Sequence, residues 1–139
     1  MTTYEYIDHT GDLGIRARGK TLQELFTNAA HALFETVAVL DTINPIEQTQ
    51  IEVEADSVAD LMVAWLDELI FRHEVDEVFF KQVKIVELSE TRLSAYAYGE
   101  PADFAKHVVF TEIKSVTYHQ LSVCRSTDGE WTANVIFDL

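Results

Sequence analysis

The stretch Asp8-His9-Thr10-Gly11-Asp12-Leu13-Gly14-Ile15 joins two short runs in which apolar and polar residues alternate. The first run begins at Tyr4 and the second at Leu13, so the pattern predicts a hairpin or a sharply bent strand pair. Two carboxylates, an imidazole, a hydroxyl and two glycines lie within it, which is more polar chemistry than an ordinary connector carries. We therefore expect a turn that carries a functional site, with Asp12 as its principal functional residue.

Two helices are predicted after this hairpin. Thr21 and Glu24 have the spacing of a capping box, in which a hydroxyl and a carboxylate close the first free amides of a helix. Apolar residues then recur every three or four positions as far as Val37, as in a core helix that packs on a sheet. Ser57 and Asp60 repeat the capping spacing before a second apolar stripe. The outer side of this second helix is expected to carry Asp60, Asp67, Glu68 and Glu74.

The remaining segments have the period of strands. Strands are predicted over residues 46–55, 78–88, 92–99, 113–118, 121–125 and 130–137. Turns are indicated by Ser89-Glu90, Gly99-Glu100-Pro101 and Thr127-Asp128-Gly129. Residues 102–110 have no clear period and are predicted to form a loop that crosses between two strands. Two helices among mostly sequential strands predict an α+β fold, with both helices packed on a largely antiparallel sheet. Because there is no linker or internal repeat, residues 1–139 form one predicted domain.

The chain is strongly acidic. It carries 10 Lys plus Arg against 24 Asp plus Glu, a formal net charge of -14 that repels phosphate backbones, so no direct nucleic-acid binding is expected. Such a field suits divalent cations or the basic surface of another protein, although acidity also simply favours solubility. Cys124 is the only cysteine, which excludes an intramolecular disulfide and a cysteine-rich zinc site. No apolar run approaches about 18 residues, so a cytoplasmic protein with no membrane contact is expected.

Asp12 and Asp138 would meet if the first and last strands lay side by side. The terminal carboxylate of Leu139 would then add a third source of oxygen. Since Ca²⁺ takes about six to eight oxygen ligands, water, a carbonyl or a partner's group would complete such a site. The alternative is that Asp12 caps a turn and that Asp138 belongs to a frayed terminus.

Histidine offers a second kind of chemistry, because imidazole carries protons near neutral pH and binds zinc. The spacing of His9 and His119 is not diagnostic, and His73 and His107 lie in a predicted helix end and a predicted loop. Structural histidines with hydrogen-bonded rings are therefore favoured. The alternative function is a stand-alone metal-dependent hydrolase that uses Asp12, Asp138, His9 and His119.

Several blocks of the chain resemble the archease family. They are residues 6–15, 19–26, 65–71, 99–100, 112–119, Trp131 and 135–139. The blocks follow one another in order over nearly the whole chain, and a match at both ends makes the resemblance specific. Gly11 stands where the family commonly has Ala, and Asp67 stands where Asn is frequent.

The resemblance implies an accessory protein rather than an enzyme. Archeases assist the RtcB-type RNA ligase of tRNA splicing and RNA repair by promoting guanylylation of its active-site histidine, which restores multiple turnover. In the family a divalent cation, calcium in known cases, is held by the second Asp of the opening motif and by the two C-terminal residues. Those ligands correspond to Asp12, Asp138 and Leu139, and neither departure from the family pattern removes one of them.

Overall fold

The computed structural model describes residues 3–9 and 12–139, with the side chains of all of them except Asp8 and His9. Its elements are β1 (Tyr4–His9), β2 (Asp12–Gly19), α1 (Leu22–Val37), the 3-10 helix η1 (Leu40–Thr42), β3 (Glu47–Glu54), α2 (Val58–Val75), β4 (Val78–Leu88), β5 (Arg92–Pro101), β6 (Ser115–Arg125) and β7 (Trp131–Asp138). β1 and β2 pair as the predicted antiparallel hairpin. Thr10 and Gly11, which belong to the stretch predicted to turn, lie outside the described residues.

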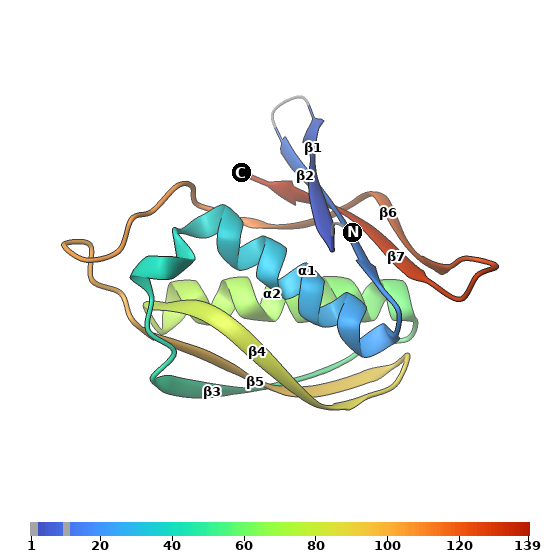
Figure 1. Cartoon of the computed structure of the whole chain (residues 1–139), viewed down its shortest axis with the longest axis horizontal. Helices are drawn as coiled ribbons and strands as arrows, with labels where there is room; N and C mark the ends of the chain where they lie inside the picture. Colours follow the sequence, from blue (N-terminus) through green and yellow to red (C-terminus); the bar gives the residue numbers. More distant parts are fainter. Residues whose placement is uncertain (1–2, 10–11) are drawn as a thin grey trace.

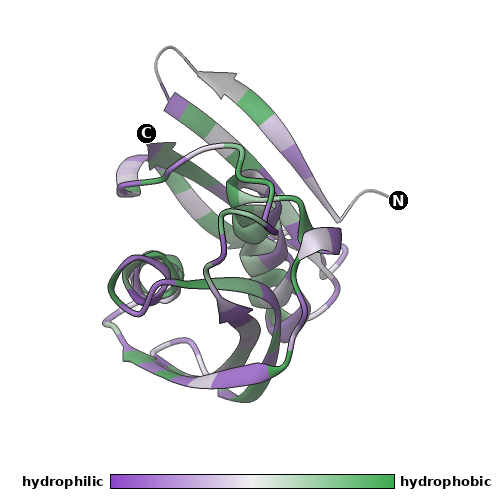
Figure 2. Ribbon diagram, turned by 90° about the vertical axis from the view of Figure 1, so that its left-hand side faces the viewer, coloured by the Kyte–Doolittle hydropathy of each residue, from purple (hydrophilic) through white to green (hydrophobic). Residues whose placement is uncertain are grey.

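The elements form three layers. One antiparallel sheet has the strand order β1-β2-β7-β6 and the other has the order β3-β5-β4, with α1 and α2 between them (Figures 1 and 2). The predicted α+β class and antiparallel pairing are confirmed, but the strands divide into two sheets instead of one. The reason lies in α1, which buries Leu25, Phe26, Ala29, Ala30, Ala32, Leu33, Phe34, Thr36 and Val37. A helix that is apolar around so much of its surface needs cover on more than one side.

Both predicted helix starts are confirmed. Thr21 Oγ1 accepts a hydrogen bond from the Glu24 amide at 3.1 Å, and Ser57 Oγ accepts one from the Asp60 amide at 3.1 Å. Trp65 of α2 is fully buried, and its indole N–H donates to the carbonyl of Phe26 in α1 at 3.0 Å. The two helices therefore share one core. Neither of these described helices is long and apolar enough to cross a membrane.

The predicted turn at Gly99-Glu100-Pro101 is wrong, because β5 continues through it to Pro101. β4 pairs with Gly99, Glu100 and Pro101, and β3 pairs with Gly99 from the other side. These pairings outweigh the local turn preference. The two strands predicted over 113–118 and 121–125 are one strand, β6. Its pairing with β7 is irregular between Thr117 and Ser122, and Gln120 there has a φ of 53°. Extra residues that bulge from a strand bend it without ending the sheet.

The prediction that Asp67 lies on the solvent side of α2 is wrong. Asp67 is half-buried, and its Oδ1 accepts a hydrogen bond from the Val116 amide of β6 at 2.8 Å. Burial raises the pKa of the Asp67 carboxyl, and the hydrogen bond from Val116 offsets part of that rise. Helical periodicity could not show this role, because the covering strand, β6, is distant from α2 in the sequence.

Candidate functional site

Asp12 and Asp138 lie directly opposite each other on neighbouring strands. β2 and β7 are antiparallel, and Asp12 is the register partner of Asp138. Side chains of directly opposed residues leave the same face of a sheet, with Cβ atoms about 4.5–5.5 Å apart. Asp12 and Asp138 therefore meet, but not through the first strand: the neighbour of β7 is β2, and β1 lies outside β2 (Figure 1). We call Asp12 and Asp138 the acidic pair.

The acidic pair belongs to the face of the sheet that points away from the helices. Along β2 and β7, Ile15, Val135 and Phe137 are buried against the core. Residues of a strand alternate between its two faces, so Asp12 and Asp138 lie on the other face. Asp12 is half-buried and Asp138 is exposed. The pair is thus accessible from outside the domain.

Asp138 is not a frayed end. It pairs with Asp12 of β2 on one side and with Ser115 of β6 on the other. Its carbonyl also accepts a hydrogen bond from the Lys114 amide at 2.9 Å. On the far side of β2, His9 is the register partner of Asp12. The backbone therefore holds the acidic pair in the middle of a row that crosses four strands.

The residues of the acidic pair fit a hard cation held in an open site. Among the side chains that the structure describes, no three or more His, Cys, Asp or Glu residues gather to hold a metal ion. In the ligand set that the family resemblance implies, the protein donors would be the two carboxylates and the main-chain oxygen atoms of Leu139. Oxygen donors of this kind suit calcium and magnesium, whose other ligands can be water or a partner's groups. The metal set Asp12, Asp138 and Leu139 stays a prediction.

A polar row four residues along β2 from Asp12 braces the same sheet. Arg16 donates from Nε to Asn134 Oδ1 at 2.8 Å and from Nη1 to Glu5 Oε1 at 3.2 Å. Asn134 in turn donates from Nδ2 to Ser122 Oγ at 2.9 Å. Glu5, Arg16, Asn134 and Ser122 are successive register partners on β1, β2, β7 and β6. The row pins the register that keeps the acidic pair aligned, and the sequence alone carried no signal of it.

A hollow of about 500 Å³ lies on this part of the sheet. Its lining includes Ile7, Gly14, Gln120 and Ile136, and Gly14 lies two residues from Asp12 on the same face. A Cβ at Gly14 would lie 3.2 Å from the Ile7 carbonyl oxygen, so this glycine allows β1 and β2 to approach closely. The acidic pair is therefore next to a recess rather than on a flat surface.

Of the four histidines discussed in the sequence analysis, the structure describes the side chains of three. His73 Nδ1 lies 2.7 Å from the Val78 carbonyl oxygen, and His107 is buried with both ring nitrogens hydrogen-bonded, so the structural roles predicted for these two are confirmed. His119 is exposed on the irregular part of β6. The side chain of His9 lies outside the described residues.

The loop after β5 carries a buried ionic cluster that the sequence analysis did not predict. The Asp103 amide donates to His107 Nδ1 at 2.9 Å, so a neutral ring carries its hydrogen on Nε2 and donates it to Glu100 Oε1 at 2.6 Å. Lys106 Nζ donates to the same oxygen. The hydrogen bonds from Lys106 and then His107 lower the pKa of the Glu100 carboxyl from 4.5 to about 2. The cluster ties the loop to β5.

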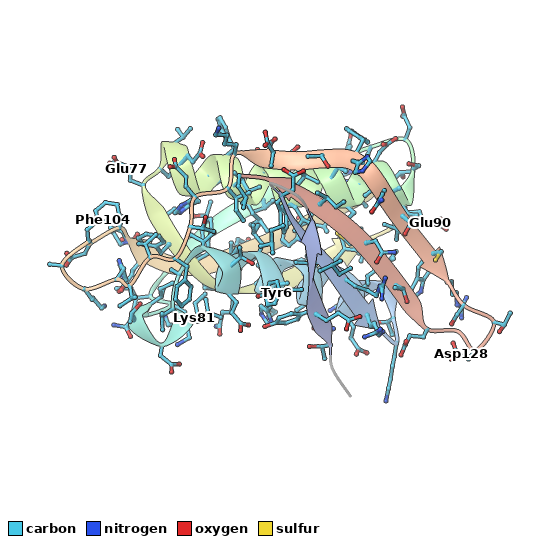
Figure 3. The ribbon with its side chains drawn as sticks, turned by 90° about the horizontal axis from the view of Figure 1, so that it is seen from above. Tyr6, Glu77, Lys81, Glu90, Phe104 and Asp128 are labelled. Carbon is cyan, nitrogen blue, oxygen red and sulfur yellow. The ribbon has the colours of Figure 1, made fainter. Side chains whose placement is uncertain are left out.

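Replacing Glu100 by glutamine is expected to remove a pH-dependent part of the stability. The pKa of Glu100 is lower in the folded than in the unfolded protein. The ionised carboxylate therefore stabilises the fold above pH 4.5, and this stabilisation is lost as the pH falls from 4.5 towards about 2. The difference in free energy of unfolding between wild type and Glu100→Gln should therefore shrink across this range, as measured by urea denaturation at several pH values. Glu90→Gln, which removes an exposed carboxylate from the β4–β5 turn, is the matched control (Figure 3). A difference that stays constant with pH would contradict the role of Glu100.

Comparison with known proteins gives a consistent result over the whole chain. Residues 4–139 match the model of the Archease protein family (MTH1598/TM1083). The chain is 38% identical to protein archease of Methanopyrus kandleri over 98% of this chain and 99% of that protein. It is 34% identical to protein archease of Pyrococcus furiosus over 100% of both chains.

Two solved structures share the fold. The solution structure of Methanobacterium thermoautotrophicum protein 1598 superposes with a TM-score of 0.82 and 35% identity over 100% of both chains. The crystal structure of a Thermotoga maritima archease, described as a possible chaperone, gives a TM-score of 0.67 and 20% identity over 96% of this chain and 94% of that chain. The family match and the identities over full length show that this chain belongs to the archease family.

Proposed function

We propose that this protein activates an RtcB-type RNA ligase in tRNA splicing or RNA repair and is not itself the catalyst. It would promote guanylylation of the ligase and so sustain multiple turnover. The observation that carries the proposal is the direct pairing of Asp12 with Asp138, which gives an archease chain an accessible two-carboxylate site.

The proposed site holds a divalent cation, Ca²⁺ by preference, through Asp12, Asp138 and a main-chain oxygen of Leu139. The β2–β7 pairing orients the two carboxylates, and the neighbouring hollow leaves room for a partner's group. A cation held there would supply positive charge near a nucleotide phosphate at the protein–protein contact. The protein's own residues position that charge and leave the chemistry to the ligase.

The charge of the chain supports a protein partner. A net charge of -14 favours encounter with the basic, RNA-binding surface of a ligase and disfavours direct binding of RNA by this chain. Association should accordingly slow as salt is added, because screening weakens attraction between exposed charges. In this proposal only the ligase contacts the RNA.

The proposal is tested by RNA ligation with the cognate ligase under single-turnover and multiple-turnover conditions, with guanylylated ligase quantified. Wild-type protein is expected to raise guanylylation and to convert ligation from about one turnover to many. Asp12→Ala should lose this stimulation while keeping the fold, because Asp12 lies on the outer face of the sheet. Circular dichroism and the melting temperature report the fold.

A wild-type protein without effect on a verified cognate ligase would refute the proposed function. Full stimulation by Asp12→Ala would keep the ligase as partner but remove the acidic pair from the mechanism. Turnover of a phosphoester or amide substrate by the purified chain alone would instead favour the hydrolase built on Asp12, Asp138, His9 and His119.

A further inference from the structure

We infer that a groove at the C-terminal end of α2 is a docking site for a basic segment of a partner protein that carries one large apolar side chain. The groove has a volume of about 1100 Å³ and lies between the end of α2, the start of β4 and the loop after β5. It is distinct from the acidic pair, which belongs to β2 and β7. Docking at this groove goes beyond the proposed function and does not depend on it.

The floor and one wall of the groove are apolar. Phe79 is buried in the floor, whereas Phe104 on the loop is 78% exposed, and the two rings meet edge to face with centroids 6.1 Å apart. Val109 adds a further exposed apolar side chain to the lining. Exposed apolar groups gathered at a recess are typical of an interaction site, whereas scattered ones are not. The floor therefore suits a large apolar side chain.

The loop that carries Phe104 is anchored. His107, which follows it closely, is buried with its ring 4.8 Å from that of Phe79 and donates to Glu100. The Ala102 amide donates to the Glu77 carbonyl at 2.7 Å, which ties the other end of the loop to the α2–β4 turn. Phe104 is thus presented by a braced loop, and binding need not order it first.

The rim of the groove is acidic. Glu74, Glu77 and Glu112 line it and are all exposed, and no Lys or Arg is among the described residues that line it. Figure 3 shows Glu77 and Phe104 at the same end of the molecule. Three carboxylates around an apolar floor complement Lys or Arg side chains that flank an apolar anchor. The same rim disfavours RNA and anionic lipid surfaces.

Glu77 has an unusual backbone conformation for its residue type. Its φ is 51°, in the left-handed region that glycine adopts without steric cost. A glutamate at this position keeps a carboxylate at the groove in spite of the strain. Backbone outliers of this kind cluster at functional sites, including ligand clamps.

The test is selection of random peptides displayed on phage against the full-length wild-type protein. Peptides with Lys or Arg around a Phe, Leu or Trp are expected to be enriched. A synthetic copy of the enriched peptide should bind at least about tenfold more weakly to Phe104→Ala and to the triple variant Glu74→Gln, Glu77→Gln, Glu112→Gln. Binding of the peptide should also shift amide signals of residues 102–112 in NMR spectra.

Phe110→Ala is the matched control, because Phe110 lies on the same loop, is 64% exposed and is not part of the groove. It should keep the affinity of the wild type. Glu77→Gly should weaken binding while raising the melting temperature, whereas Gln120→Gly, at the other non-glycine residue with positive φ among those described, should raise only the melting temperature. No enrichment of basic apolar peptides, or equal binding by Phe104→Ala and the wild type, would overturn the inference.

Discussion

Asp12→Asn and Asp138→Asn are each expected to abolish stabilisation of the protein by calcium. Each change removes one charged ligand of the proposed site and keeps the size of the side chain. A ligand that binds only the folded state stabilises it by about 2.7 kcal/mol at a concentration one hundred times its Kd. The wild type should therefore show this gain between chelator and saturating calcium in urea denaturation, and both variants should show almost none.

The double variant separates one shared site from two independent carboxylates. Because Asp12 and Asp138 are register partners, they should act as a unit, and the double variant should lose no more calcium stabilisation than either single variant. Asp56→Asn, at an exposed carboxylate that precedes α2, is the control and should respond to calcium as the wild type does. An unchanged wild-type stability with calcium would refute the cation site and leave the ligase proposal to its own experiment.

Gly99→Ala is expected to destabilise the protein by about 3 kcal/mol or more, at the upper end of the cost of overpacking. A Cβ at Gly99 would lie 1.9 Å from the Phe79 carbonyl oxygen and 2.8 Å from the Phe80 Cα. Both neighbours are backbone atoms, so no change of rotamer can relieve the clash. β5 is also the central strand of its sheet and cannot move away from β4 without disturbing β3. The free energy of unfolding from urea titration measures the loss.

Gly14→Ala provides the comparison for this prediction. A Cβ there would lie 3.2 Å from the Ile7 carbonyl oxygen, and β1 is an edge strand that can shift slightly. The expected cost is clearly smaller than that of Gly99→Ala. Equal costs at the two positions would show that backbone crowding at Gly99 is not the main cause of the lost stability.

The sequence by itself determined the features that depend on nearby residues. Helix periodicity and the capping pairs Thr21–Glu24 and Ser57–Asp60 predicted α1 and α2, because these signals act within one turn of helix. The alternation of residues 78–88 predicted β4 with its observed bounds. The residue types in the two end motifs also indicate Asp12 and Asp138 as candidate ligands of a cation.

Only the tertiary structure decided the features that depend on pairing between distant strands. It divided the strands into two sheets, made β2 the neighbour of β7 and carried β5 through Gly99 to Pro101. It also turned Asp67 towards β6 and enclosed the groove beside Phe104. In each case the deciding contact joins segments far apart in the chain, whose register and burial follow from the packing of the whole core. Local patterns therefore indicate Asp12 and Asp138 as candidates, and long-range packing places them opposite each other on neighbouring strands.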